Sequence, residues 1–338
     1  MTRGGTAAAP SPHRILVTGA SGFVGRHLVD ALARSAAPGT RVLSAGRERT
    51  CDVMLDLADP ASVRLAVEAA APDVVFHLAG EASVAQAGNN AAATWQVNLV
   101  GTMALAAALG TVSPAATLLF TSSAEVYGRA FLDGPVDERT RPEPSSVYAQ
   151  AKLAAEQMLA AVLPTSATLI VARPSNHIGP GQDARFALPS FAEQLARAEQ
   201  AGERAQIHVG NLDSERDFMD VRDVVRAYEM LVCQYGGTGA RETFNISSQQ
   251  SRSIKSLLDL LREDARVDSD VIVDPARSRP SEVPIASVSS SRLRDAVGWV
   301  PSIEISASVH DVLNAARGDQ HHADIVGSVS ANGRSLRP

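Results

Sequence analysis

Three side chains near the middle of the chain have the types and spacing needed for proton transfer to an oxygen atom. Tyr148 and Lys152 open a segment that predicts a helix, and a spacing of four residues places both on one face. An ammonium beside a phenol is expected to lower the pKa of Tyr148 from about 10, which makes it a proton donor or acceptor near neutral pH. Because such a pair also arises by chance, it needs support from its surroundings.

That support comes from the segment Thr121–Gly128, which follows an apolar run predicted to be a strand. Active sites of parallel sheets gather at the carboxyl ends of strands. The Ser123 hydroxyl can therefore donate to the same oxygen that Tyr148 protonates. Two donors directed at a developing alkoxide suit a reaction by hydride transfer. Lys152 could in addition hold the ribose of a nicotinamide.

The elements that must position these groups follow a simple alternation up to about residue 171. Short apolar runs predict strands, and the longer alanine-rich segments between them predict helices. The strands are expected at Ile15–Thr18, Arg41–Ser44, Val74–Leu78, Leu118–Thr121 and Thr168–Val171, and the helices at Gly25–Arg34, Pro60–Ala70, Ala91–Leu109 and Tyr148–Leu163. This pattern predicts an α/β fold, a Rossmann-type doubly wound parallel sheet.

The pattern becomes irregular after Arg173, where prolines and glycines interrupt it. Helices are expected at Phe186–Gly202, Val221–Cys233 and Ser253–Asp264. We therefore predict a dinucleotide-binding domain at residues 14–173 and mainly a smaller C-terminal substrate-binding lobe at 174–316, with some segments returning to the Rossmann core. Residues 1–13 and 317–338 are predicted to be flexible tails.

A glycine-rich turn joins the first predicted strand to the first helix. Gly19, Gly22 and Gly25 would give a tight turn, room for a pyrophosphate, and close packing of the helix on the sheet. The free N–H groups of the first helical turn would bind phosphate. The spacing at this first strand–helix junction indicates a dinucleotide site rather than three turn glycines without a ligand.

Arg47 indicates a cofactor that carries a phosphate on the 2′-oxygen of its ribose. This residue stands at the end of the second predicted strand, where an acidic residue would bind a free ribose 2′-hydroxyl. A guanidinium instead fits a 2′-phosphate, so NADP(H) is favoured over NAD(H), with a plain surface arginine as the other interpretation. Asp56 is a candidate for the adenine amino group, and His77–Gly80 for the diphosphate.

Charge and composition exclude several other classes. A formal net charge of −6 and a pI of about 5.8 argue against a nucleic-acid partner. The two cysteines, Cys51 and Cys233, have no metal-like spacing and are expected to be free thiols in a reducing compartment. No uncharged apolar run of about 18 residues stands out, so we expect a cytoplasmic protein without a membrane partner. The chemistry requires no metal.

Taken together, the motifs resemble those of the extended short-chain dehydrogenase/reductases, the nucleotide-sugar epimerases, dehydratases and reductases. The resemblance rests on Thr18–Gly25, His77–Gly80, Asn98–Thr102, Ser123–Gly128 and the Tyr148/Lys152 pair. It implies that Ser123, Tyr148 and Lys152 are catalytic. The expected cofactor-binding residues are Gly19, Ser21, Gly22, Phe23, Val24, Gly25, Arg47, Asp56, Leu57, Leu78, Ala79, Gly80, Asn98, Thr121, Tyr148 and Lys152.

The second half narrows the resemblance to GDP-4-keto-6-deoxy-mannose reductases, through segments 173–182, 210–228, 274–284 and 298–301. By that resemblance Asn176 contacts the sugar or diphosphate, and Arg216 and Arg279 clamp the diphosphate. Ser83 would lie near the sugar, and Ser123 would also bind the substrate. Two arginines on separate segments also suit a doubly charged diphosphate on physical grounds. The implied reaction is reduction of the C4 ketone of a nucleotide-linked 4-keto-6-deoxy sugar by NADPH.

Some residues depart from the pattern and keep alternatives open. Glu81 and Ala82 interrupt a stretch that is usually serine-rich, and Glu282 replaces an aspartate. Glu125 stands where dehydratases of the superfamily place a catalytic glutamate, so a GDP-mannose 4,6-dehydratase or a nucleotide-sugar 4-epimerase is the first alternative. A non-catalytic NADP-binding sensor is the second. The resemblance also implies a homodimer that pairs through the helices at 91–109 and 148–163.

Overall fold

The computed structural model describes residues 14–277 and 283–332, with side chains up to Gly318. The chain divides into two compact units. The Rossmann unit consists of the chain up to Ser175 together with Val221–Gln249 and Ser287–Val300. The small unit consists of Asn176–Asp220, Gln250–Ala286 and the chain from Pro301 onward. The predicted N-terminal tail, residues 1–13, lies outside the described residues.

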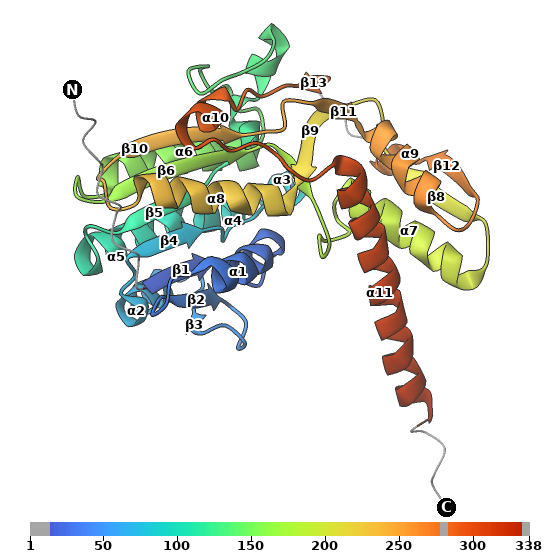
Figure 1. Cartoon of the computed structure of the whole chain (residues 1–338), viewed down its shortest axis with the longest axis horizontal. Coiled ribbons are helices and arrows are strands. Elements are labelled where there is room, and N and C mark those ends of the chain that lie inside the picture. The colour runs from blue at the N-terminus through green and yellow to red at the C-terminus, as the bar shows by residue number, and fades with distance from the viewer. Residues whose placement is uncertain (1–13, 278–282, 333–338) are drawn as a thin grey trace, which may run out of the picture. The chain divides into compact units, whose positions relative to one another are not determined.

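The Rossmann unit is built on a parallel sheet of seven strands (Figure 1). The strands are β1 (Arg14–Thr18), β2 (Arg41–Gly46), β3 (Val53–Met54), β4 (Val74–His77), β5 (Thr117–Thr121), β6 (Thr168–Pro174) and β10 (Arg241–Ile246). Their order is β10-β6-β5-β4-β1-β2-β3, and every neighbouring pair is parallel. This confirms the predicted α/β fold. The strand order reverses between β1 and β4, the place where such sheets bind ligands.

Helices cover both faces of this sheet (Figure 1). On one face α1 (Phe23–Ser35) packs against α8 (Val221–Tyr235). On the other, α5 (Thr102–Val112) packs between α2 (Pro60–Ala70) and α6 (Val147–Val162). Alanines recur in the buried core between the sheet and this second helix layer, and small side chains let the helices approach closely. The shorter elements are α3 (Val84–Asn89), α4 (Ala91–Trp95), α10 (Ser291–Val297), η2 (Ala124–Tyr127) and η3 (Arg129–Asp133).

One predicted helix is interrupted. Where the sequence predicts a continuous α-helix at 91–109, a π-helical segment, η1 (Gln96–Gly101), separates α4 from α5. The cause is tertiary. Asn98 is held by two hydrogen bonds to the backbone of Glu81, and Gly101 lies so close to the carbonyl of Leu57 that a Cβ would approach its oxygen to 2.5 Å. Single turns of π-helix are frequent at functional sites.

The same run, Ala91–Val112, is apolar and long enough to cross a membrane, with a mean hydropathy of 1.3 over its best window. The sequence prediction that no such segment stands out was therefore wrong. Within the Rossmann unit α5 contacts α2 and α6, and 39% of that window is buried. An alanine-rich helix that packs on a sheet has the same composition as a weak membrane span, so this criterion alone carries little weight.

The small unit has its own core. The parallel pair β8 (Ala205–Val209) and β12 (Ser269–Val273) lies with α7 (Ala187–Ala201), α9 (Ile254–Asp264) and α11 (Ile305–Asn332). A second sheet consists of β7 (Asn176–Ile178), β9 (Glu215–Asp220), β11 (Ser251–Ser253) and β13 (Ile285–Ala286). Among the described residues, β13 is the last strand of the chain. A 3₁₀ turn, η4 (Pro275–Arg277), follows β12.

The C-terminal helix departs from the prediction of a flexible tail at 317–338. The backbone of α11 continues as a helix through Asn332. Once a helix is anchored by a packed segment, each further residue adds a hydrogen bond at little cost, and no proline interrupts the sequence between Pro301 and Pro338.

Candidate active site

The glycine turn between β1 and α1 is shaped for close approach. Gly19 has φ +71°, and a Cβ built on it would lie 2.8 Å from the backbone nitrogen of Ala79. A Cβ on Gly25 would lie 2.1 Å from the carbonyl oxygen of Gly19. Gly22 is the N-cap of α1 and provides no side-chain cap, so no capping side chain covers the backbone at the start of this helix.

These features fit the diphosphate of a dinucleotide. The turn leaves backbone rather than side chains at the helix N-terminus, which favours an anion through both hydrogen bonds and the helix dipole. Ser21 lies beside the end of β2, because its Oγ is 3.7 Å from a Cβ built on Gly46. Arg47 follows Gly46 directly and is exposed. The structure thus places Ser21 and Arg47 at adjacent strand ends.

The segment after β3 places the predicted adenine contacts. Asp56 Oδ1 accepts a hydrogen bond from the backbone of Ala58 at 2.9 Å, and its own N–H donates to Ser62 Oγ at 3.0 Å. Leu57 is buried and packs against the π-helical segment at Gly101. Asp56 therefore stabilises this turn, and its role toward adenine stays a prediction.

A buried histidine fixes the end of β4, the segment that contains Leu78, Ala79 and Gly80. His77 Nδ1 lies 2.7 Å from Thr18 Oγ1, and Nε2 lies 3.0 Å from Thr102 Oγ1. Thr18 also accepts from the N–H of Ala79, and Thr102 donates to the carbonyl of Asn98. These neighbours fit a neutral ring with its proton on Nε2. Burial lowers the pKa of His77 to about 3, so the ring stays neutral at physiological pH.

Gly80 lies between Asn98 and Lys152, the residue predicted to be the catalytic lysine. A Cβ built on it would lie 2.7 Å from Asn98 Oδ1 and 3.5 Å from Lys152 Nζ, and its φ is +155°. Asn98 is buried and bridges to Glu81, accepting from its N–H at 2.8 Å and donating to its carbonyl at 3.1 Å. The π-helical turn thus serves to hold the residues that follow Gly80.

The predicted catalytic residues converge at the carboxyl end of β5. Ser146 caps α6, which sets Tyr148 and Lys152 in its first turns. Both are buried, with 8% and 5% of their surface exposed. The Ser123 hydroxyl shares a hydrogen bond with the Tyr148 phenol, and Lys152 Nζ donates to the carbonyl of Thr121 at 2.8 Å. Sequence reasoning therefore identified groups that the fold brings together.

The predicted acidity of the phenol is not what this arrangement gives. Burial raises the pKa of Tyr148 to about 12; the hydrogen bond with Ser123 opposes this rise, and the carboxylates of Glu125 and Glu81 add to it. Burial also lowers the pKa of Lys152 to about 8, against the attraction of Glu156. Desolvation is the largest cause of both pKa shifts, so the Tyr148 phenol stays protonated at neutral pH and Lys152 is poised to titrate.

Glu125 stands at the position where dehydratases of the superfamily are expected to carry a catalytic glutamate. It lies in the short helix η2, which Ser123 caps. Its backbone N–H donates to Ser123 Oγ at 3.1 Å. Ser83, predicted to lie near the sugar, is buried at the N-cap of α3, where Oγ accepts from the N–H of Gln86 at 3.3 Å. Its own N–H donates to Glu81 Oε1 at 2.7 Å. Ser83 therefore stabilises the local turn, and a contact with the sugar stays a prediction.

The remaining predicted substrate residues belong to the small unit. Asn176 is exposed at the start of β7, opposite Phe218 of β9. Arg216 lies on β9, and its Nη1 donates to the carbonyls of Glu215 at 2.8 Å and Pro284 at 3.3 Å. Arg279 lies outside the described residues. Asn176 and Arg216 therefore come from paired strands of one sheet.

Sequence reasoning missed two features of the Rossmann unit. Glu81 was noted as a departure, but the structure shows its charge acting on Tyr148. The buried pair Glu156 and Arg173 lies in direct contact at 2.5 Å. The only sequence signal for Glu156 was its position four residues beyond Lys152 on the same helical face, and nothing local pointed to Arg173 as its partner.

Comparison with known proteins agrees with this geometry. Residues 15–247 match the model of the NAD dependent epimerase/dehydratase family. The chain is 39% identical over 303 residues to a GDP-6-deoxy-D-mannose reductase of Pseudomonas aeruginosa, covering 89% of this chain and 96% of that protein. It is 28% identical over 320 residues to a dTDP-6-deoxy-L-talose 4-dehydrogenase (NAD(P)(+)) of Kitasatospora kifunensis, covering 92% and 98%.

Solved structures give the same result. The structure of RMD from Pseudomonas aeruginosa complexed with NADPH superposes with a TM-score of 0.78 at 36% identity, over 90% of this chain and 99% of that one. A UDP-glucose 4-epimerase of Thermotoga maritima gives a TM-score of 0.78 at 25% identity, over 90% and 99%. The chain belongs to the NAD-dependent epimerase/dehydratase family and is an NAD(P)-dependent oxidoreductase.

Proposed function

We propose that this enzyme reduces the C4 ketone of a nucleotide-linked 4-keto-6-deoxy sugar with NADPH. The favoured reaction converts GDP-4-keto-6-deoxy-D-mannose to GDP-6-deoxy-D-mannose or its C4 epimer. The observation that carries the proposal is the convergence of the Ser123 hydroxyl, the Tyr148 phenol and the Lys152 ammonium next to Gly80, at the strand ends where the glycine turn also lies. The similarity to a GDP-6-deoxy-D-mannose reductase over nearly its whole length supports the choice of sugar.

Each of these groups has a distinct task in a reduction. When bound, NADPH supplies the hydride. The Tyr148 phenol, whose pKa is raised to about 12, is protonated at neutral pH and donates its proton to the new alkoxide. Ser123 donates a second hydrogen bond that orients the carbonyl oxygen. Lys152 places a positive charge next to the phenolate that forms, and its hydrogen bond to Thr121 fixes its position.

The cofactor preference rests on Arg47. It is exposed directly after Gly46, the last residue of β2, and no acidic side chain follows that strand before Glu48. A guanidinium at this position pairs with a 2′-phosphate in two hydrogen bonds, whereas an acid would repel it. We therefore propose NADP(H) as the cofactor that is used in preference to NAD(H).

The nucleotide diphosphate is assigned to the small unit. Arg216 of β9 and Asn176 of β7 supply a guanidinium and an amide from neighbouring strands, which suits a diphosphate bound to a sugar. Arg279 is proposed as a second cation for the same group. We further propose a cytoplasmic homodimer that pairs through α5 and α6, where Met103 and Val162 remain 44% and 45% exposed in one chain. Light scattering tests the dimer.

A panel of substrates tests the proposed reaction. The enzyme is incubated with NADPH and the 4-keto-6-deoxy sugars of GDP, dTDP, UDP and CDP, and loss of NADPH absorbance is followed. We expect oxidation to be fastest with the GDP sugar, one NADPH consumed for each sugar reduced, and a loss of about 10²-fold or more in kcat for Tyr148→Phe. Absence of NADPH oxidation with every sugar would refute the proposal.

The alternatives are distinguished by the same assay. Glu125 and Glu81 both place carboxylates near Tyr148, which would suit a 4,6-dehydratase that moves a proton on carbon. A dehydratase or a 4-epimerase regenerates its cofactor within one turnover, so incubation with GDP-mannose or a GDP-hexose would give product without net NADPH loss. A non-catalytic sensor would retain its biological activity after Tyr148→Phe.

A further inference from the structure

A bidentate ion pair is buried behind the catalytic residues in the Rossmann unit. Arg173 Nη2 lies 2.5 Å from Glu156 Oε2, and Arg173 Nε donates to Glu156 Oε1 at 3.0 Å. Each side chain is only 8% exposed. Removing two charges from water costs about as much as their attraction returns, so a buried pair is weak evidence of a stabilising role. Its location suggests another role.

The pair lies on the helical face that carries the reactive groups. Tyr148, Lys152 and Glu156 follow one another at intervals of four on α6, so phenol, ammonium and carboxylate occupy successive turns of one face. Arg173 reaches Glu156 from β6, the strand next to β5. The carboxylate therefore stands one turn from the lysine.

The last residue of β5 and the two residues that follow it each contact one member of this series. The Thr121 carbonyl accepts from Lys152, the Ser122 hydroxyl donates to Glu156, and the Ser123 hydroxyl shares a hydrogen bond with Tyr148. Ser122 is buried, and its N–H donates to the carbonyl of Ala172 at 2.8 Å. Three consecutive residues are thus tied to three consecutive turns of α6. The contact of the middle residue, Ser122, depends on Glu156.

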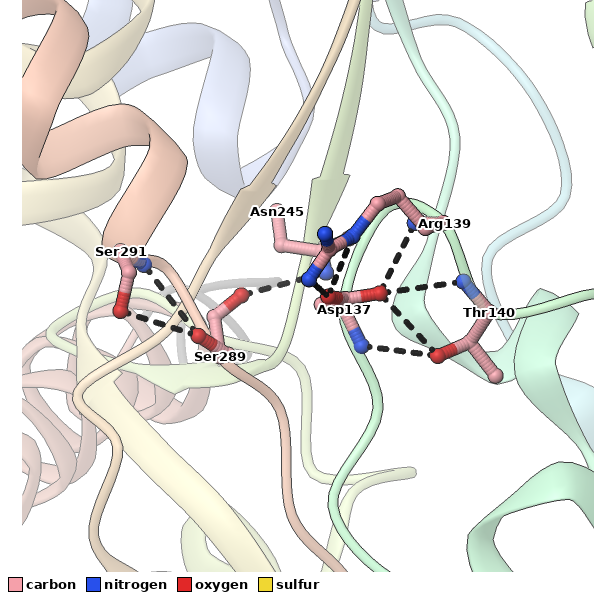
Figure 2. Close-up of polar contacts among 6 residues, drawn as sticks. All are labelled: Asp137, Arg139, Thr140, Asn245, Ser289 and Ser291. Carbon is pink, nitrogen blue, oxygen red and sulfur yellow. Dashed lines mark hydrogen bonds and ion pairs between the residues drawn. The ribbon is translucent and has the colours of Figure 1, made fainter.

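The far side of the pair is fixed as well. Arg173 Nη1 donates to the Tyr127 hydroxyl at 3.0 Å, and Tyr127 donates to Asn245 Oδ1 at 2.8 Å. Asn245 Nδ2 in turn donates to the carbonyl of Ser289 at 3.2 Å, as Figure 2 shows. The N–H of Asn245 donates to Glu138 Oε1 at 2.8 Å, next to the Asp137 turn that Figure 2 draws. A network of this kind, with each member engaged, holds its carboxylate in one orientation.

We propose that Glu156 is a positioning residue for the reduction. Its carboxylate holds Ser122, and thereby the Ser123 hydroxyl, in place, and it keeps the side chain of Lys152 in its ammonium form. The inference rests on the proposed function, because it assigns a role within that same site.

The electrostatic part follows from what surrounds Lys152. Burial lowers its pKa to about 8, and Glu156 is the charge that opposes the fall. His77 faces it from β4 and is neutral, while the ring of Phe120 lies 5.0 Å below the ammonium. Among the described residues, the other charged or titratable groups of this region include Tyr148 on the same helix, Arg173 on β6, Glu81 after β4, Glu125 and Tyr127 on η2, and Tyr228 on α8, which interacts with Tyr148.

The two lysines of this chain make a direct test possible. Lys152 and Lys255 are the only lysines in the sequence. In protein labelled with ¹³C at the lysine Cε, each gives one resonance, and Lys255→Arg assigns them. Lys255 is exposed and paired with Asp259 at 2.6 Å, so it serves as an internal reference. We expect Lys152 to titrate near pH 8 in the wild type and at least about one pH unit lower in Glu156→Gln, with Lys255 unmoved.

Activity gives the second readout. With the sugar that the wild-type enzyme reduces, Glu156→Gln is expected to lower kcat about tenfold or more. The KM values for the sugar and for NADPH should change less than about threefold. The alkaline limb of the pH profile of kcat should move toward lower pH. Glu156→Asp should restore part of kcat. A Glu156→Met/Arg173→Met double variant removes both charges, so it keeps the test available if the single variant leaves Arg173 unpaired and unfolds.

A matched control comes from the small unit. Glu199 forms an ion pair with Arg317 at 2.7 Å and accepts from the N–H of Arg266 at 2.9 Å. Glu199→Gln should lower the stability of its unit and leave the Lys152 titration and the kcat profile unchanged. An unshifted Lys152 titration in folded Glu156→Gln, or a wild-type kcat in the double variant, would overturn the inference. Because the titration needs no substrate, it decides the inference even if the wild type reduces none of the sugars.

Discussion

Burial of the Lys152 ammonium has a consequence for stability that can be measured as a function of pH. Lys152 is 5% exposed and its pKa falls from 10.5 to about 8 in the folded protein. At about 1.4 kcal/mol for each pH unit, keeping this group charged costs the fold about 3 kcal/mol at neutral pH. Lys152→Met removes that cost. It also leaves the Thr121 carbonyl without its donor, a loss of about 1–2 kcal/mol, so the variant should be more stable by about 1–2 kcal/mol at pH 7.

The sign of the pH dependence is fixed by the direction of the shift. The unfolded chain holds the lysine proton up to about pH 10.5, whereas the folded protein releases it near pH 8. Between these values the unfolded state binds more protons, so wild-type stability rises with pH relative to the variant. The advantage of Lys152→Met should therefore shrink by about 2 kcal/mol between pH 7 and pH 10.

Urea unfolding followed by tryptophan fluorescence measures this difference. Both tryptophans, Trp95 and Trp299, belong to the Rossmann unit, so the signal reports the unit that contains Lys152. Lys255→Met, which removes an exposed lysine, should change stability by less than about 1 kcal/mol without a pH trend. A gap between wild type and Lys152→Met that stays constant from pH 7 to pH 10 would refute the reasoning.

Three further substitutions test the glycine turn, the end of β2 and the core of the Rossmann unit. Gly25→Ala should weaken NADPH binding, measured by calorimetry, more than about tenfold, because its Cβ would lie 2.1 Å from the Gly19 carbonyl oxygen. Gly110→Ala is the control and should leave binding unchanged, because its Cβ would make only ordinary van der Waals contacts with Pro164. Arg47→Ser should raise KM for NADPH about tenfold or more and leave KM for NADH unaltered; equal changes would count against the 2′-phosphate assignment. Trp299→Ala should lower the free energy of unfolding by about 3–5 kcal/mol, since the indole is fully buried and donates to the backbone of Asp223 at 3.0 Å. A smaller loss would mean that the neighbouring side chains move in to fill the cavity.

The parts of the fold that sequence predicted best are those set by local patterns. The apolar runs and alanine-rich segments of the first half correspond to β1, β2, β4, β5 and β6 and to α1, α2 and α6, with ends that differ by a few residues. The glycine spacing located the turn at Gly19 and Gly25, because positive φ and lack of a Cβ are properties of the residue itself.

What sequence did not predict depends on contacts between distant segments. The π-helical turn at Asn98 is caused by hydrogen bonds to Glu81 and by the closeness of Leu57 to Gly101, none of which a helical pattern contains. The pKa of Tyr148 was predicted from its neighbouring lysine alone. Burial, which only the fold defines, reverses that expectation and raises the value.

The candidate active site likewise contains residues that local sequence patterns predicted and residues that only contacts between distant segments reveal. Ser123, Tyr148 and Lys152 were found because their residue types and spacing are visible along the chain, and the structure brings them together. The Glu156–Arg173 pair joins a helix to a strand, so it becomes apparent only when α6 packs on β6. Buried charged pairs of this kind are part of what positions a site and leave little trace in a single sequence.

The most direct test of the account follows the hydrogen that the enzyme transfers. The enzyme is given GDP-4-keto-6-deoxy-D-mannose and NADPH that carries deuterium at the transferred position, and the product is analysed by NMR. The account predicts one deuterium at C4 of the sugar for each NADPH oxidised, and loss of this product with Tyr148→Phe. A sugar product without deuterium at C4, formed while NADPH remains intact, would contradict it.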